Sequence, residues 1–201
     1  MKERPILFSG AMVRAILDGR KTQTRRILKH KIPKNAEKEI GEDYVLARWQ
    51  IRPPYWVGMK LWVREAFRYC EATDGYNDFY VQYRVDEKAI GWRDNAGRMN
   101  YPIDTRWRPS IHMPRWASRI TLEVTDVRVE RLHDICEEDA RAEGITDGGC
   151  LVCGEHEPCG CTNPTPDARD SFINLWDSIN AQRGYSWSSD PCVWVVAFKK
   201  I

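Results

Sequence analysis

The side chains best suited to chemistry lie in a short basic stretch, residues 19–26. It reads Gly-Arg-Lys-Thr-Gln-Thr-Arg-Arg, so four cations and two threonine hydroxyls fall within eight residues. Cations this close repel one another, and a bound phosphate or other anion would relieve the repulsion. The stretch follows an expected helix, whose end would hold Lys21 and Thr24 at fixed positions. It therefore predicts an anion-binding site, with a solvated basic turn as an equally weighted alternative.

A second stretch, rich in cysteine, has the spacing of a metal site. Two cysteines separated by two residues form a familiar half-site for zinc, and a further pair follows six residues later. We predict a structural zinc ion bound by four thiolates: Cys150, Cys153, Cys159 and Cys161. His156 is an alternative ligand, and a loop of free thiols is the competing interpretation. The other cysteines are expected to be ordinary buried thiols: Cys70, Cys136 and Cys192.

Glu65 is a carboxylate in an apolar setting. It falls on the more apolar face of an alternating strand expected over residues 61–69. A carboxylate there needs a partner or a function. Pairing with Arg26 or Arg64 is slightly favoured over catalysis.

Residues 70–118 are expected to form a long irregular excursion that mixes tryptophans with arginines. That mixture suits stacking on bases and contacts to phosphates. Equally, the tryptophans could pin the excursion to the core while the arginines are solvated. Together with the basic stretch, this gives the predicted ligand-binding set: Arg20, Arg25, Arg26, Trp62, Arg64, Glu65, Trp107, Arg115 and Trp116.

The basic stretch resembles the signature of the ASCH domains, which have a PUA-like fold and occur among phage and prophage proteins. The resemblance continues in the segments 58–65, 120–124, 138–145 and 193–198. In a bacterial member of this family that acts as an amidohydrolase on N4-acetylcytidine, a lysine, a threonine and a glutamate are catalytic. The resemblance implies that Lys21 is the base, Thr24 the nucleophile and Glu143 the proton donor.

The physical chemistry of these residues is compatible with the implied roles. A threonine hydroxyl needs an adjacent base, and the neighbouring arginines push the pKa of Lys21 down, as such a base requires. Glu143 falls at an expected helix C-terminus, where the helix dipole keeps a carboxyl group protonated. Because Lys21 and Thr24 are three positions apart, the chain must bend between them for the two side chains to meet.

The elements that position these residues can be read from periodicity. Ser9 caps a helix that Gly19 ends. Strands are expected over residues 5–8, 61–69, 79–85, 119–132 and 193–198, and a phase change near residues 125–126 indicates a bulge. Further helices are expected from Asp134 to about Glu143 and over residues 171–182. We predict a mainly β fold with α elements: a PUA-like small β-barrel with peripheral helices and an inserted zinc loop.

Length and charge indicate one domain with one electropositive face. The 201 residues suit a single domain, 1–201, with insertions at 70–118 and 146–166. The net charge is only +2, but residues 1–60 carry +8 and the remainder −6. That asymmetry suits an RNA, a nucleoside or another anion as partner. No apolar run can span a bilayer and no signal peptide is recognisable, so a cytoplasmic protein is expected.

The leading functional prediction is an ASCH protein that interacts with RNA or a modified nucleoside and hydrolyses an amide such as that of N4-acetylcytidine. One alternative is a non-catalytic module that binds RNA or a nucleotide, because kinship of fold does not fix function. Another is a phage accessory protein that binds other proteins.

Overall fold

A five-stranded sheet is the framework of the protein. The computed structural model describes residues 3–29, 53–71, 79–86, 92–93, 99–100, 106–146 and 168–201. The strand order is β1-β3-β8-β9-β2. The strands are β1 Glu3–Leu7, β2 Gln23–Ile27, β3 Lys60–Arg64, β8 Thr121–Arg131 and β9 Cys192–Lys200. β1 runs parallel to β3, and the other neighbours are antiparallel.

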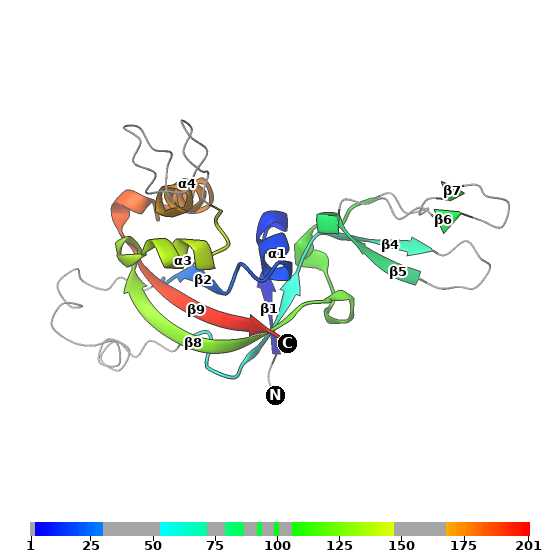
Figure 1. The fold of residues 1–201 in the computed structure, drawn as a ribbon, viewed down its shortest axis with the longest axis horizontal. Helices are drawn as coiled ribbons and strands as arrows, with labels where there is room; N and C mark the ends of the chain where they lie inside the picture. The colour runs from blue at the N-terminus through cyan, green and yellow to red at the C-terminus, as the bar shows by residue number, and fades with distance from the viewer. Residues whose placement is uncertain are drawn as a thin grey trace.

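A bulge bends the two longest strands. The register of β8 on β9 shifts between Val124 and Asp126, which leaves Thr125 as the extra residue. An extra residue in one strand raises the local twist and bends it. Figure 1 shows β8 and β9 as two strongly curved strands that run side by side. The phase change predicted near residues 125–126 is therefore confirmed as a bulge.

The sheet is open between its two edge strands, β1 and β2. Among the described residues no backbone ladder joins them, so the predicted closed barrel is only a curved, open sheet. A side chain bridges the gap instead, because the Arg26 guanidinium donates to the Leu7 carbonyl oxygen at 3.0 Å. Closure depends on strand tilt and stagger, which periodicity in the sequence does not report.

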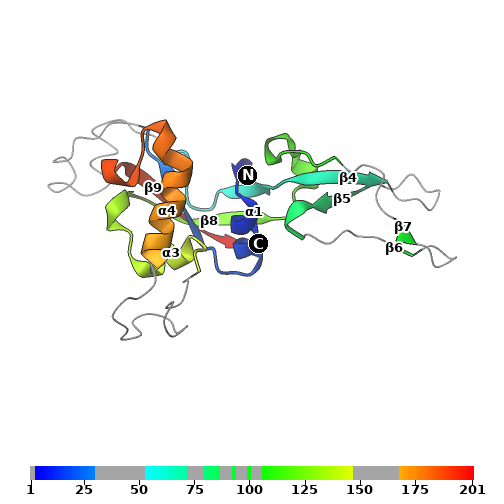
Figure 2. The same ribbon diagram turned by 90° about the horizontal axis from the view of Figure 1, so that it is seen from above.

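In the part of the chain that the structure describes, three α-helices pack on the sheet: α1 Gly10–Leu17, α3 Glu137–Ala142 and α4 Ala168–Asn180. Ser9 caps α1 by accepting from the Met12 backbone N–H at 3.4 Å, and Gly19 follows with φ +78°, both as predicted. Figures 1 and 2 place α3 and α4 together over one end of the curved sheet. There Phe172, Trp176 and Val195 share a buried core with residues of α3.

The helix predicted to begin at Asp134 begins later, at Glu137. Residues 132–134 form a separate 3₁₀ turn, and the Asp134 carboxylate accepts from the Arg131 backbone N–H at 3.3 Å. Ile135 is extended, with ψ 127°, and separates the turn from α3. The predicted capping box of Asp134 with Glu137 is therefore wrong: Asp134 closes the turn that begins after Arg131, and Cys136 is the N-cap of α3.

The strand predicted over residues 61–69 is two strands in different sheets. β3 ends at Arg64, and β4 Phe67–Glu71 pairs instead with β5 Phe79–Tyr83. The Ala66 carbonyl oxygen accepts from the Arg84 backbone N–H at 2.9 Å, so the chain has left the main sheet by that point. Alternation continues through the break, which is why the pattern could not reveal it.

The β4–β5 hairpin, called the arm below, projects away from α3 and α4, as Figure 2 shows. The range 70–118, predicted to be mostly irregular, thus contains most of this hairpin. It also contains the short pair β6 Trp92–Arg93 and β7 Met99–Asn100. Part of this range, and nearly all of the predicted zinc loop at 146–166, lie outside the described residues.

Candidate active site

The chain turns sharply after α1 and presents Lys21 to the end of α3. The backbone N–H groups of Arg20 and Lys21 both donate to the Ala15 carbonyl oxygen, at 2.9 and 3.0 Å. Thr22 then donates to the Ala142 carbonyl oxygen and accepts from Phe198, at 2.9 and 2.8 Å. This is the bend that the spacing of Lys21 and Thr24 required, and it precedes β2.

Lys21 and Glu143 form a buried ion pair. The Lys21 Nζ donates to the Glu143 Oε2 at 2.8 Å and to the Glu143 carbonyl oxygen at 2.7 Å. The two residues expose 2% and 4% of their surface. Gly144 makes the approach possible, because it has φ +89° and a Cβ there would lie 2.8 Å from that of Ala15. The glutamate predicted from the family motif is therefore the partner of the predicted lysine.

Arg25 links this pair to two further carboxylates. Its NH1 donates to the Glu143 Oε1 at 3.4 Å, and its NH2 donates to the Glu130 Oε2 at 3.0 Å and the Asp139 Oδ2 at 2.6 Å. The buried Arg25 Nε has no hydrogen-bond partner among the described residues. Lys21, Arg25, Glu130, Asp139 and Glu143 are called the ion network below. The network holds Arg25 in place, which differs from the free anion contact expected for it.

Burial and hydrogen bonds compete in setting the pKa values in the ion network. Burial lowers the pKa of Lys21, because the charged ammonium loses its water; Glu143 opposes that shift, and Arg26 and Arg25 add to it. The neighbouring arginines thus act as predicted but are a smaller cause than burial. Burial alone would raise the pKa of Asp139, but hydrogen bonds from Arg25 and Gln23 bring it below its ordinary value.

A pocket of about 470 Å³ opens beside the network, between β1, β2 and α4. It occupies the open edge of the sheet. Its cationic lining residues are Arg25, Arg26, Lys29, Arg64 and Arg183, and its aromatic ones are Tyr55, Phe172 and Trp176. Among the described lining residues Glu143 is the single carboxylate. An anionic ligand with a flat ring fits such a lining.

Two of the three predicted catalytic residues line this pocket, and the third lies behind one of them. Thr24, 1% exposed in β2, and Glu143 both line it. Lys21 does not line it and reaches it only through Glu143. Both Glu143 carboxylate oxygens accept hydrogen bonds from cations, which differs from the protonated donor that was predicted.

Glu65 belongs to a different cluster. Its two oxygens accept from the Arg119 Nε and NH2, each at 3.0 Å, rather than from Arg26 or Arg64 as predicted. Arg119 also bonds both Asp86 oxygens at 3.0 Å and lies 3.9 Å from the centre of the Tyr83 ring. Burial raises the pKa of Glu65 while Arg119 opposes the shift. Glu65 is thus an ion-paired group that joins β3 to the arm, and it does not line the pocket.

Some of the other predicted ligand residues lie near the pocket. Arg26 and Arg64 line it, and Arg64 also lies over the Trp62 ring at 4.6 Å and donates to the Ile111 carbonyl oxygen at 3.2 Å. Trp62 is buried, at 7% exposure. Arg20 lies outside the pocket and pairs with Asp18 at 3.1 Å.

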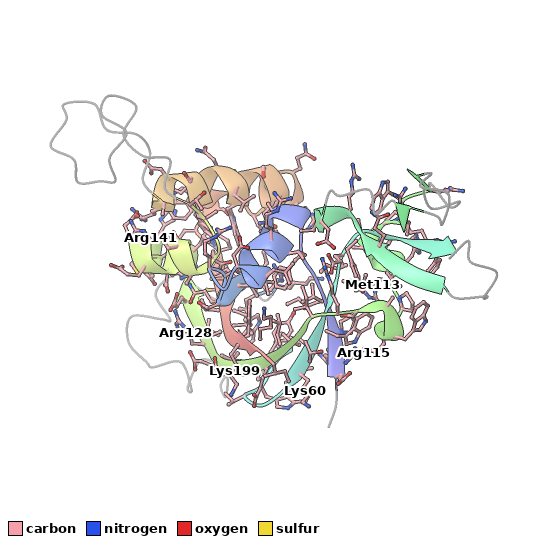
Figure 3. All side chains as sticks on the ribbon, turned by 45° about the vertical axis from the view of Figure 1, so that its right-hand side comes forward. Lys60, Met113, Arg115, Arg128, Arg141 and Lys199 are labelled. Atoms are coloured by element: carbon pink, nitrogen blue, oxygen red, sulfur yellow. The ribbon has the colours of Figure 1, made fainter. Side chains whose placement is uncertain are left out.

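The remaining predicted ligand residues lie around the arm, away from the pocket. Figure 3 shows Arg115 and Met113 on this side of β1, opposite Arg128 and Arg141. Arg115 pairs with Glu3 at 2.6 Å. Trp107 lies under the Arg68 guanidinium at 4.7 Å. Trp116 exposes 69% of its surface. The pattern of tryptophans and arginines thus marks a second surface.

Asn180 is a pocket residue that the sequence analysis missed. It ends α4, lines the pocket and is only 7% exposed. Its signal was present, because Asn180 follows Trp176 by one helical turn on the apolar stripe of α4. A polar residue on such a stripe is a candidate ligand contact.

The predicted metal ligands lie in a part of the chain that the structure does not describe: Cys150, Cys153, Cys159, Cys161 and the alternative His156. Within the described ranges no group of three metal-binding side chains occurs. Cys192 is buried as predicted, whereas Cys136 is exposed because it precedes the first turn of α3. The side chain of Cys70 also lies outside the described part.

Comparison with known proteins gives a weak similarity of fold. The sequence matches no family profile and no curated protein. An ASCH domain from Lactobacillus crispatus is 13% identical with a TM-score of 0.41, over 99% of this chain and 79% of that one. A DUF984 protein from Enterococcus faecalis is 11% identical with the same TM-score, over 100% and 77%. Similarity at this level carries no ligand or activity to this chain.

In the described part of the chain, every helix is too short or too polar to cross a bilayer. What the fold and site define by themselves is an open curved sheet whose free edge holds a cationic, aromatic pocket beside a buried ion network.

Proposed function

We propose that the protein binds a modified nucleoside, free or within RNA, and hydrolyses an amide bond on it, as in N4-acetylcytidine. One observation carries the proposal. Thr24 and Glu143, which are far apart in the sequence, both line one pocket, and Lys21 is hydrogen-bonded to Glu143 beside it. These are the three residues that the resemblance to ASCH domains implies. The roles remain those implied by that resemblance.

The lining of the pocket supports a nucleoside as the ligand. Phe172 and Trp176 offer faces on which a base can stack, and stacking of a base on an aromatic ring is worth about 1–3 kcal/mol. Asn180 offers one acceptor and two donors, which complement the edge of a pyrimidine. Arg26, Lys29 and Arg64 suit a phosphate at the rim.

The hydrogen bonds of Lys21 support its role as a base. A neutral amine has two N–H groups and one lone pair. With both N–H groups donated to Glu143, the lone pair of a neutral Lys21 is free to accept a proton, and in the proposed reaction this is the proton of the Thr24 hydroxyl. Burial lowers the pKa of Lys21, which favours this neutral form. The Thr24 oxygen attacks the amide carbonyl carbon, the C–N bond breaks, and the departing amine takes the proton through Glu143. Water then hydrolyses the acyl-threonine ester, which releases acetate and restores the Thr24 hydroxyl.

Release of acetate from N4-acetylcytidine tests the proposal. Thr24→Ala should abolish turnover, whereas Thr24→Ser keeps a hydroxyl and should retain part of it. Unfolding by urea should be similar for the two variants, because Thr24 is not part of the ion network. Equal turnover by wild type and Thr24→Ala would refute the hydrolytic role.

A second candidate, binding without catalysis, is favoured by a specific observation. Lys21 does not line the pocket, and two of its hydrogen bonds go to Glu143. In that case Lys21 only positions Glu143 and Arg25. Calorimetry would then show N4-acetylcytidine bound but unchanged, with equal affinity for wild type and Thr24→Ser.

A further inference from the structure

The base of the arm carries an aromatic and cationic cluster that the pocket does not use. The rings of Trp116 and Tyr69 are stacked, with centroids 5.6 Å apart and an angle of 15° between them. The Arg108 guanidinium also lies over the Tyr69 ring, at 4.7 Å. Phe67 meets Tyr69 edge-on at 5.2 Å and is fully buried. Trp116, Tyr69 and Arg108 are called the outer stack below.

Trp116 is held out into solvent by a fixed turn. The residues Met113 and Ala117, on either side of it, are 1% and 2% exposed and pack against Phe67. The Ala117 N–H donates to the Pro114 carbonyl oxygen at 3.2 Å, which closes the turn. The turn therefore presents a large flat ring that is 69% exposed, without first having to be ordered by a ligand.

The charges around the outer stack complement a phosphate backbone. Arg108 is exposed, Arg106 is exposed two residues before it in the sequence, and Arg68 lies over Trp107 at 4.7 Å. Glu3, a described carboxylate on this side, is already paired with Arg115. Stacked rings interleaved with guanidinium groups bind bases through their faces and phosphates through charge. This combination favours a single-stranded nucleic acid over an apolar peptide.

The edge strand β1 connects the outer stack to the pocket. Arg115, next to Trp116, pairs with Glu3 at the start of β1, and Pro5 to Leu7 at its other end line the pocket. Figure 3 shows Arg115 beside this strand. Four steps along a strand cover about 13 Å. A few nucleotides of a single strand span that length, since stacked nucleotides rise about 3.4 Å each.

We infer that the outer stack is a second nucleotide subsite, on which a base stacks a few positions away from the nucleotide held in the pocket. The inference rests on the proposed function, because the pocket supplies the first subsite. Its consequence is that the preferred ligand is single-stranded RNA rather than a free nucleoside.

The test compares two ligands in parallel. Fluorescence anisotropy measures affinity for a labelled oligocytidine of about ten nucleotides, and calorimetry measures affinity for N4-acetylcytidine. Trp116→Ala should weaken binding of the oligonucleotide roughly 5- to 100-fold and leave binding of the nucleoside unchanged. Trp116→Phe should restore most of the loss, because it keeps an aromatic face.

Trp56→Ala is the matched control, because Trp56 is also exposed, at 43%, but lies outside the outer stack. It should leave both affinities unchanged. If Trp116→Ala binds the oligonucleotide as tightly as wild type, or if Trp56→Ala is equally damaging, the subsite is refuted while the pocket stands. If wild type binds the nucleoside but no oligonucleotide, the subsite is also refuted and the pocket stands. If wild type binds neither, the proposed function fails with it.

Discussion

Glu143 and Glu65 are both buried carboxylates bonded to arginine, but their surroundings indicate different roles. Glu143 lines the pocket and bonds the lysine whose pKa burial lowers. Glu65 is bonded by Arg119, with Asp86 beside it, and does not line that pocket. An ion pair by itself is therefore not enough to nominate a catalytic carboxylate, and the adjoining pocket distinguishes the two.

Glutamine substitutions separate the two glutamates. Glu143→Gln should lower kcat/KM for N4-acetylcytidine by about 10²–10⁴, the usual contribution of a proton-transfer group. Glu65→Gln should leave kcat/KM within a small factor and lower the free energy of unfolding by about 1–3 kcal/mol, through a lost charged hydrogen bond. Enzyme kinetics and urea unfolding give both quantities. A larger loss of activity in Glu65→Gln than in Glu143→Gln would show that the proton donor has been assigned to the wrong glutamate.

Asn180 should affect binding more than stability. Asn180→Ala removes an amide that lines the pocket at the end of α4, so the free energy of unfolding should change little. Affinity for N4-acetylcytidine should fall about tenfold, the effect of one lost hydrogen bond in a buried site. Calorimetry and urea unfolding test the two halves. Ser178→Ala, on the exposed side of the same helix, is the control and should leave the affinity for N4-acetylcytidine unchanged.

At the scale of elements, Gly144 sets how closely α3 approaches the turn after α1. Gly144→Ala combines a strained φ with a Cβ contact at 2.8 Å from Ala15. Gly184→Ala is the matched control, because Gly184 has φ +82° but no atom within 4 Å of the new Cβ. The control should lose about 1–2 kcal/mol of stability. Gly144→Ala should lose more stability than the control in urea unfolding, and kinetics should show a loss of activity as well. Equal losses of stability in the two variants would show that the contact between α3 and the turn after α1 tolerates a methyl group.

The link between α3 and β2 should be sensitive to acid. The pKa of Asp139 in the folded state is below its ordinary value of 3.8. Its contribution is therefore fully present above pH 3.8 and is lost as pH falls through the folded pKa, because the unfolded chain then binds more protons. Asp139→Asn should be less stable than wild type at pH 7, and the difference should shrink as pH falls below 3.8. Urea unfolding across this range measures it, and a constant difference would contradict the assignment.

The sequence predicted those elements whose signals are local. Ser9 and Gly19 bounded α1, and the phase change at residues 125–126 located the bulge. The break between β3 and β4 was missed because alternation does not stop where a strand changes sheets. Two further features depend on contacts between residues that are distant in sequence, which periodicity does not report. They are the pairing of Glu65 with Arg119 and the position of Asn180 in the pocket.

At the scale of the whole molecule, the zinc site predicted from the spacing of Cys150, Cys153, Cys159 and Cys161 lies outside the described residues and stays a prediction. Purified protein should contain about one zinc per chain by elemental analysis under reducing conditions. Cys153→Ser should lose the zinc, whereas Cys136→Ser, at an exposed thiol outside the predicted ligand set, should keep it. Protein that carries no zinc when purified without chelator would refute the site.

The strand order also constrains when the pocket can exist during synthesis. β2, which carries Thr24, is an edge strand whose ladder partner is β9, where Thr24 faces Val196. β9 is synthesised long after β2, so β2 lacks its hydrogen-bonded neighbour strand during that time. Pairing across such sequence distances closes slowly, because loop-closure entropy is lost before contacts form. The edge of the pocket formed by β2 is therefore completed only after β9 has emerged, so the proposed site forms late in synthesis.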